Sequence, residues 1–327
     1  MKTPTLYIII PCYNEEQVLP ITSGIFLKKL LQLIKDQLIT PESKIVFIND
    51  GSKDSTWEII KELCKKEYYL GICLSRNRGH QNALLAGLLE TKDLCDITIS
   101  IDCDGQDDIN AMDDMICAYY KGADIVYGVR NNRDSDTCFK KFTAEMFYKI
   151  MTKLGVESIY NHADYRLVSS KILEELARYK EVNLFLRGMF PLIGFNSTCV
   201  YYKRETRIAG ESHYPLSKMI SLAVNGITSL SIQPIRYITY MGILVSLLSG
   251  LGIIWAVLCV TLQIAISGWT SMICIICFLG GAQMISLGII GEYIGKIYLE
   301  TKERPRYSIK EYTYKTENNS TKIDFIK

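Results

Sequence analysis

Residues 97–106 read ITISIDCDGQ, a strand-like run that ends abruptly in two acidic residues, Asp102 and Asp104. Similar runs rich in Ile, Leu and Val occur at 6–10, 44–48, 69–74 and 124–129. Segments with helical patterning lie between them, at about 18–38, 54–67, 81–90 and 110–120. Repeated strand–helix–strand units with apolar strands predict an α/β fold, a mostly parallel sheet with helices on both faces.

Polar residues follow each predicted strand. They are 11–15 (PCYNE), 49–52 (NDGS), 75–78 (SRNR) and 102–106 (DCDGQ). In open α/β sheets ligands bind beyond the carboxyl ends of the strands, so we expect these segments to form one site. The first strand is not followed by GxGxxG, and no GxxxxGK[ST] occurs, which argues against a dinucleotide fold or a P-loop.

The acidic segment is the sharpest candidate. Asp102 and Asp104 would repel each other unless a cation neutralises them, and Mg²⁺ or Mn²⁺ on a diphosphate would do so, with Gln106 as a neutral oxygen ligand. A solvated acidic turn is the alternative. Asp50 suits either turn chemistry or a hydrogen bond to a nucleotide. Glu15 suits either a helix start or a nucleotide contact.

Composition limits the choice of partner and compartment. The net charge is only +2, so nothing global favours nucleic acid. The 11 cysteines are scattered, which is typical of a reduced, cytosolic chain. The three histidines have no metal-ligand spacing. We expect no signal peptide, because the apolar run 6–10 is too short for one and acidic residues follow at once.

A long charge-free interval lies between Arg236 and Glu292. A bilayer crossing needs about 20 apolar residues, so the interval predicts a hairpin of two transmembrane helices at 237–262 and 270–291. Basic residues flank both ends, which predicts a multi-pass protein of the cytoplasmic membrane with its catalytic domain and both termini cytoplasmic. The expected domains are a catalytic domain (1–212), interfacial amphipathic helices (213–235), the transmembrane pair (236–292) and a cytoplasmic tail (293–327). A buried soluble hairpin is the alternative.

Basic groups stand where an anionic acceptor could bind. Arg130 follows a predicted strand, Lys141 comes shortly after it, and Arg207 precedes 209–212 (AGES). Arginine binds phosphate through two parallel hydrogen bonds, which favours a phosphate site. Ordinary surface charges are the alternative.

Taken together, these segments resemble family 2 glycosyltransferases that act on polyprenyl phosphates, and most closely the bactoprenol glucosyltransferases. Dolichol-phosphate mannose synthases are more distant kin. The resemblance covers about residues 6–307. It rests on IIIPCYNEE (8–16), FINDGSKDST (47–56), SRNRGHQNALLAGL (75–88), IDCDGQDD (101–108), GADIVYGVR (122–130), ADYRLVS (163–169), RETRIAGESHY (204–214), NGITSLSIQP (225–234) and LGIIGEYIGKIYLETKERPRY (287–307).

The resemblance implies a GT-A fold, an inverting mechanism and a divalent metal, Mg²⁺ or Mn²⁺. It implies transfer of one sugar, glucose first, from a nucleotide-sugar to polyprenyl phosphate, for modification of cell-surface glycans. The implied donor-binding residues are Pro11, Tyr13, Glu15, Asp50 and Asp102. The implied metal ligands are Asp102, Asp104 and Gln106. The implied acceptor-phosphate residues are Arg130, Lys141, Arg207 and Ser212. The implied catalytic residues are Asp104, Arg207 and Asp164, the last as a base or an orienting group.

The sequence departs from the family pattern at several positions. Gly105 stands where Leu is usual, and Pro is missing near Asp108. His80 and Gln81 replace a Lys-containing pair, and Lys141 stands where Arg is usual. UDP-N-acetylglucosamine, UDP-galactose and GDP-mannose therefore stay open as donors. Assembly into a homo-oligomer also stays open.

Two other functions are alternatives for this sequence. A processive polysaccharide synthase would carry a Gln-x-x-Arg-Trp motif and more membrane helices, and neither is seen in the sequence. A membrane protein that only binds nucleotide-sugars or lipids is the non-enzymatic alternative, and the intact acidic residues argue against it.

Overall fold

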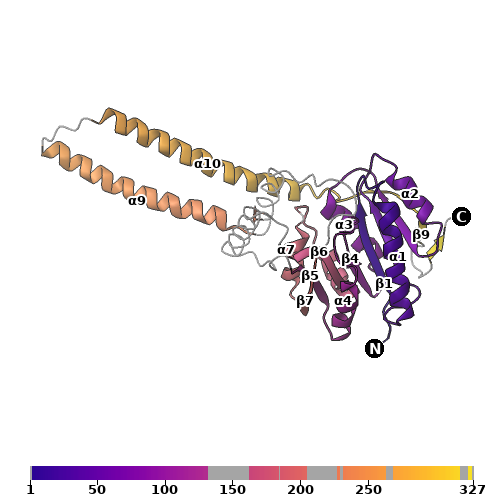
Figure 1. The fold of residues 1–327 in the computed structure, drawn as a ribbon. Helices are drawn as coiled ribbons and strands as arrows, with labels where there is room; N and C mark the ends of the chain where they lie inside the picture. The colour runs from indigo at the N-terminus through magenta and orange to yellow at the C-terminus, as the bar shows by residue number, and fades with distance from the viewer. Residues whose placement is uncertain are drawn as a thin grey trace.

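A computed structural model of the chain describes residues 2–131, 162–183, 185–204, 227–228, 231–262, 268–316 and 323–325. They form a sheet with helices on both faces, from which a pair of long helices projects (Figure 1). The strands are β1 (Leu6–Cys12), β2 (Lys44–Asn49), β3 (Tyr69–Leu74), β4 (Ile97–Ser100), β5 (Ile125–Arg130), β6 (His162–Ser169), β7 (Ser197–Tyr202), β8 (Ile309–Tyr312), β9 (Tyr314–Thr316) and β10 (Ile323–Phe325). The helices are α1 (Leu19–Lys35), α2 (Thr56–Leu63), α3 (His80–Thr91), α4 (Ala111–Tyr120), α6 (Ser170–Arg178), α7 (Leu186–Ile193), α9 (Gln233–Thr261) and α10 (Trp269–Thr301).

The large sheet has the strand order β7-β5-β6-β4-β1-β2-β3-β8. β4, β1, β2 and β3 are parallel neighbours, as predicted. β6 runs antiparallel between β4 and β5, and β8 pairs antiparallel with β3. The predicted α/β class with flanking helices is confirmed, but the sheet is mixed rather than mostly parallel. The difference arises because β6 and β8 were not recognised as strands.

The side chains of β1 alternate between two hydrophobic cores. Leu6, Ile8 and Ile10 pack with α1, α2 and α4 on one face of the sheet. Tyr7 and Ile9 pack with α3, α6 and α7 on the other face. A central strand buried on both sides must be apolar along its whole length, which is why residues 6–10 show no polar alternation.

Two glycines permit close approaches that position the loops of the site. Gly51 has φ +62°, and a Cβ there would lie 2.5 Å from the backbone carbon of Arg76. Gly87 lets α3 sit directly on the sheet, because a Cβ would lie 2.5 Å from Ile9 and 2.6 Å from Ile48. Only glycine removes the side chain that would separate these elements.

The tail beyond α10 returns to the sheet. β8 adds an edge strand beside β3. The hydroxyls of Tyr307 and Tyr312 donate to the two carboxylate oxygens of Glu90 in α3, at 3.0 and 2.6 Å. The C-terminal segment therefore covers an edge of the catalytic sheet.

The predicted multi-pass cytoplasmic-membrane localisation is wrong, and the structure does not support the predicted transmembrane hairpin. Among the residues that the structure describes, no helix is both long enough and apolar enough to cross a bilayer. The prediction relied on the absence of charge from 237–291, and absence of charge is a weaker criterion than high hydropathy. Tyr240 in α9, and Gln283 and Ser286 in α10, are polar residues in that interval.

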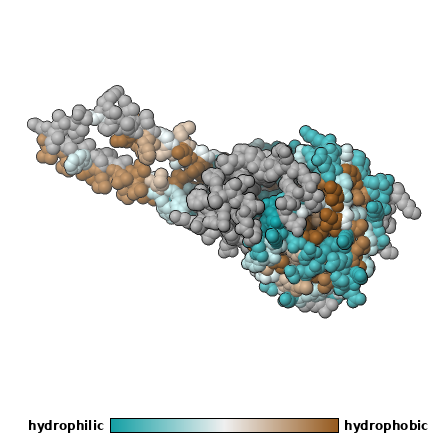
Figure 2. Space-filling model, in the orientation of Figure 1, coloured by the Kyte–Doolittle hydropathy of each residue, from teal (hydrophilic) through white to brown (hydrophobic). Residues whose placement is uncertain are grey.

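The helix pair still exposes many apolar side chains, including Leu247, Trp255, Phe278 and Met284 (Figure 2). Most of the predicted interfacial segment, 213–235, lies outside the described residues.

Candidate active site

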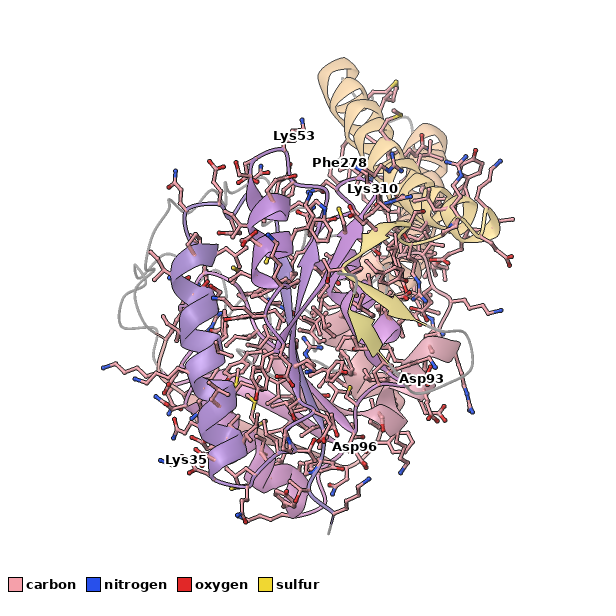
Figure 3. The ribbon with its side chains drawn as sticks, turned by 90° about the vertical axis from the view of Figure 1, so that its right-hand side faces the viewer. Lys35, Lys53, Asp93, Asp96, Phe278 and Lys310 are labelled. Atoms are coloured by element: carbon pink, nitrogen blue, oxygen red, sulfur yellow. The ribbon has the colours of Figure 1, made fainter. Side chains whose placement is uncertain are left out.

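The carboxyl ends of the central strands meet at one edge of the sheet. In the register of the parallel pairs, Cys12 lies beside Asn49, and Ile9 lies beside Ser100. The backbone N–H of Asp50 donates to the carbonyl of Cys12 at 2.9 Å. Figure 3 shows Lys53, which follows β2, and Asp96, which precedes β4, at opposite ends of the sheet. The loops after β1, β2 and β4 therefore share one edge, as predicted.

The loops after β1 and β2 are joined by side-chain hydrogen bonds. The N–H of Asn14 donates to Oγ of Ser52 at 3.0 Å, and that of Glu15 donates to Oγ1 of Thr56 at 2.8 Å. Tyr13 is 42% exposed at this rim, and Pro11 is buried in β1. An exposed aromatic ring on a rigid loop is suited to stacking on a base. The roles predicted for Pro11, Tyr13 and Glu15 remain predictions.

Asp50 organises the neighbouring loop. It is 2% exposed, and its two carboxylate oxygens accept the backbone N–H groups of Arg78 and Gly79 at 2.7 and 2.9 Å. Burial raises the pKa of Asp50, and these two hydrogen bonds oppose the rise. Asp50 therefore holds the loop that leads into α3, whatever contact it makes with a nucleotide.

Asp102 stands at the rim after β4 with 34% of its side chain exposed. Its Oδ1 lies 3.5 Å from Nε2 of His80, the first residue of α3. The pKa of Asp102 is raised to about 6, and burial is the largest cause. His80 opposes this rise, whereas the charges of Asp107, Asp164 and Asp104 add to it. A cation placed here would relieve this repulsion.

The donor set fits a metal that substrate phosphates help to hold. Among the described residues, no three His, Cys, Asp or Glu side chains are grouped to hold a metal by themselves. Mg²⁺ is usually held by one or two carboxylates with substrate phosphates completing its shell, which the pair Asp102 and Asp104 could provide. Oδ1 of Asp104 accepts the N–H of Gln106 at 3.1 Å. The side-chain oxygen of Gln106 accepts from Arg204, so its role as a ligand remains a prediction.

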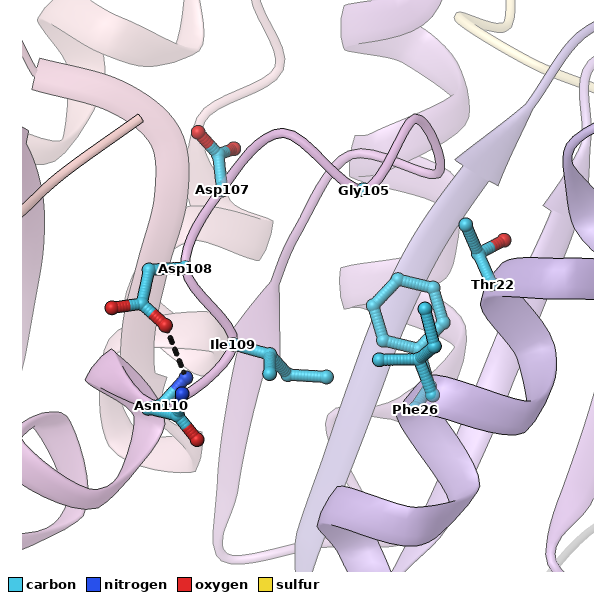
Figure 4. A pocket seen from close by; sticks show the side chains of 8 residues that line it. Thr22, Phe26, Gly105, Asp107, Asp108, Ile109 and Asn110 are labelled. Atoms are coloured by element: carbon cyan, nitrogen blue, oxygen red, sulfur yellow. Dashed lines mark hydrogen bonds between the residues drawn. The ribbon is translucent and has the colours of Figure 1, made fainter. Parts of the chain in front are cut away.

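A cavity of about 190 Å³ lies behind the acidic loop (Figure 4). It is lined by Thr22, Ile25 and Phe26 of α1 and by Gly105 and residues 107–110. The two carboxylates of the predicted metal site are not among its lining residues.

Asp164 is the centre of a buried charge cluster. Its Oδ1 accepts from Nη2 of Arg166 at 2.9 Å. Arg187 donates to both oxygens, from Nε at 3.1 Å and from Nη2 at 3.0 Å. Nε2 of His80 lies 3.5 Å from Oδ2. His80 thus stands between Asp164 and Asp102 and links the two carboxylates.

The charges in this cluster set each other's ionisation. Burial opposes ionisation of Asp164, but Arg187, His80 and Arg166 outweigh it and hold its pKa well below the usual range. Burial also opposes protonation of His80, but Asp164 and Asp102 raise the pKa of His80 to about 9. At neutral pH Asp164 is an anion that holds three cationic side chains. The catalytic role of Asp164, as a base or as an orienting group, remains a prediction.

Comparisons with known proteins show the family of the chain. Residues 7–177, more than half of the chain, match the family model for glycosyl transferase family 2. The chain is a family 2 glycosyltransferase. An uncharacterized glycosyltransferase of Bacillus subtilis strain 168 is 50% identical over 94% of this chain and 91% of its own. The bactoprenol glucosyl transferase of Shigella phage SfX is 40% identical, over 93% and 98%. The resemblance predicted from the sequence is confirmed.

A homologue in Escherichia coli K12 is described as a prophage bactoprenol glucosyl transferase homolog. It is 39% identical over 93% of this family 2 glycosyltransferase and 97% of its own chain. Among solved structures, the mannosyltransferase PcManGT of Pyrobaculum calidifontis covers 90% of this chain and 85% of its own, with 13% identity and a TM-score of 0.48. That structural likeness is too low to add to the argument.

The predicted acceptor-phosphate residues are described only in part. Lys141, Arg207 and Ser212 lie outside the described residues. Arg130 pairs with Asp107, through Nη2 and Oδ1 at 3.1 Å, and its Nε donates to the hydroxyl of Tyr202 at 3.2 Å. Burial opposes the charged form of Arg130. Asp107 and Tyr202 outweigh burial and raise the pKa of Arg130 above its usual value. Arg130 thus braces the acidic loop of this glycosyltransferase against β7, and phosphate binding remains a prediction for it.

Three residues of the cluster were not predicted as site residues: His80, Arg166 and Arg187. His80 carried a signal, because it stands where the family pattern has Lys. Arg166 lies two residues after Asp164 on β6, and alternate residues of a strand share one face. Arg187 lies in an apolar segment, and no signal in the sequence connected it to Asp164.

Proposed function

We propose that this protein transfers a single sugar from a nucleotide-sugar to a polyprenyl phosphate, with glucose from UDP-glucose as the first choice and undecaprenyl phosphate as the acceptor. Similarity to the bactoprenol glucosyl transferase of Shigella phage SfX over 93% of this chain carries the choice of substrate class. The chemistry is supported by the cluster in which His80 joins Asp102 to Asp164.

The reaction is a single in-line displacement. An oxygen of the lipid phosphate forms a bond to the anomeric carbon, while the bond from that carbon to the diphosphate oxygen breaks. The nucleoside diphosphate leaves with the bonding electrons. An α-linked donor therefore gives a β-linked lipid-phosphate sugar. The nucleophile is already an anion, so the reaction needs no strong general base.

The side chains of the rim supply position and charge. Tyr13 would stack on the base, and Asp50 keeps the loop at 76–79 in place beneath the donor. Asp102 and Asp104 would hold a divalent cation, which when bound supplies Lewis-acid stabilisation of the diphosphate. The imidazole of His80 lies beside that group, 3.5 Å from Asp102, and Asp164 keeps His80 and Arg187 oriented. Most of the rate enhancement would come from positioning and electrostatic stabilisation.

The decisive experiment measures radiolabelled sugar entering the lipid phase. Purified protein receives undecaprenyl phosphate in detergent, Mg²⁺ or Mn²⁺, and in separate reactions UDP-glucose, UDP-N-acetylglucosamine, UDP-galactose or GDP-mannose. A labelled lipid from one donor, lost when EDTA is added, is the expected result. A folded protein that labels no lipid from any donor would overturn the proposed acceptor. Release of nucleoside diphosphate without lipid product would point to a different acceptor.

A further inference from the structure

The last turn of α10 holds the segment that leads into α7. Oε2 of Glu300 accepts the backbone N–H of Val182 at 2.8 Å. Oε1 accepts both the backbone N–H and the side-chain amide of Asn183, at 2.7 and 2.8 Å. That amide also donates to the carbonyl of Lys296 at 3.3 Å. A carboxylate that accepts three hydrogen bonds defines the position of this segment closely.

The same segment sets where α7 begins. The N-cap residue Phe185 gives α7 no side-chain hydrogen bond, so the first turn depends on other elements. The N–H of Leu186 donates to Oε1 of Gln81 in α3 at 2.9 Å. Glu300 and Gln81 thus hold the start of α7 from two sides, one from α10 and the other from the helix that carries His80.

Arg187 is the next residue, and it makes the two parallel hydrogen bonds to Asp164. About a third of its side chain is exposed, against none of Arg166, so Arg187 is the more easily displaced of the two arginines. A guanidinium that uses Nε and Nη2 together tolerates little rotation of the helix that bears it. The placement of α7 therefore decides whether Arg187 makes both of its hydrogen bonds to Asp164.

We infer that Glu300 is a positioning residue for sugar transfer, because through Val182 and Asn183 it fixes α7 so that Arg187 engages Asp164. This inference rests on the proposed function for its kinetic test. It couples the helix pair α9–α10 to the carboxylates of the donor site, which lie on different elements of the fold.

The test is a double-mutant cycle with Glu300→Ala, Arg187→Ala and the double variant, measured as kcat and KM for undecaprenyl phosphate. Because a small misplacement of groups in an active site lowers the reaction rate strongly, we expect Glu300→Ala to lower kcat by about 10- to 100-fold with a smaller change in KM. In the Arg187→Ala background the same change should have little further effect. Glu300→Gln, which keeps one acceptor oxygen, should fall between wild type and Glu300→Ala. Glu303→Ala, an exposed carboxylate just past the same helix, is the matched control and should behave as wild type.

The inference would be overturned if the two fold-losses in kcat multiply in the double variant. It would also be overturned if Glu300→Ala is fully active. Hydrogen exchange gives a second readout that needs no turnover. Glu300→Ala should speed amide exchange in peptides covering 182–190 and in β6, while α1 stays unchanged. If wild type transfers no sugar to lipid phosphate, the proposed function fails, and unchanged exchange in both segments would separately sink the role of Glu300.

Discussion

Replacing Asp164 by Asn tests whether this carboxylate anchors the cluster. The substitution keeps the shape of the side chain but removes its charge and one acceptor oxygen. Arg166 is fully buried and would lose its ion-pair partner while it stays beside Arg187. Removing one partner of a buried ion pair costs about 3–5 kcal/mol. For a domain of roughly 150–250 residues, this corresponds to a drop in Tm of roughly 6–20 °C.

The pH dependence of this effect has a defined sign. The pKa of Asp164 is held well below its usual range in the folded protein. In the unfolded chain it returns to about 3.9, so the stabilisation is fully present above that value and is lost as pH falls through the folded pKa. The Tm difference between wild type and Asp164→Asn should be largest between about pH 4 and 6.5, and it should shrink below about pH 4 as Asp164 is protonated. Because Asp164 helps raise the pKa of His80 to about 9 in the folded protein, the difference should also shrink as pH rises from about 6.5 toward 9 and His80 loses its proton.

Thermal unfolding followed by circular dichroism measures both expectations. Asp93→Asn is the matched control, because the side chain of Asp93 is 73% exposed and pairs with its neighbour Lys92 at the surface. Such surface pairs contribute little, so the control should unfold close to wild type. Equal Tm values for wild type and Asp164→Asn at pH 7 would refute the anchoring role. A Tm difference that grows on acidification below about pH 4 would contradict the assigned ionisation.

Three further predictions concern the rim and its loops. Asp104→Ala should lower metal-dependent release of nucleoside diphosphate by at least about 100-fold, and an active variant would remove Asp104 from the metal site. His80→Lys should keep most of the transfer activity because it keeps the positive charge, whereas His80→Leu should lose about 100-fold, and equal activities would refute a role for that charge. Gly51→Ala should cost at least about 2 kcal/mol in urea unfolding, because its Cβ would meet the backbone of the 76–79 loop at positive φ. Gly24→Ala in α1, where a Cβ meets nothing within 4 Å, should instead stabilise by up to about 1 kcal/mol, and the reverse order would contradict the packing described.

Local pattern predicted much of the sheet. The run at 69–74 is β3 with the bounds expected, and 44–48 and 124–129 match β2 and β5 to within a residue at each end. These strands are buried on both faces, so each is a continuous apolar run that can be recognised in the sequence. β6 was missed because ADYRLVS mixes polar and apolar residues, and its Asp164 and Arg166 belong to the site rather than to the core.

The helix pair shows where a sequence pattern misled. The interval 237–291 lacks charge, and that absence was read as a membrane hairpin. Helices α9 and α10 do form there, so their existence was predictable. The criterion that failed was apolarity over a full bilayer thickness in the part of these helices that the structure describes.

Sequence patterns alone predicted the family, the α/β class and the gathering of Asp50, Asp102 and Asp104 at one edge, because strand ends in a parallel sheet share an edge. The contacts of those carboxylates became known only from the packed fold. His80 of α3, Arg166 of β6 and Arg187 of α7 meet at Asp164 through side-chain contacts between separate elements. Such contacts depend on how helices pack on the sheet and in which direction β6 runs, and local periodicity carries no information about either.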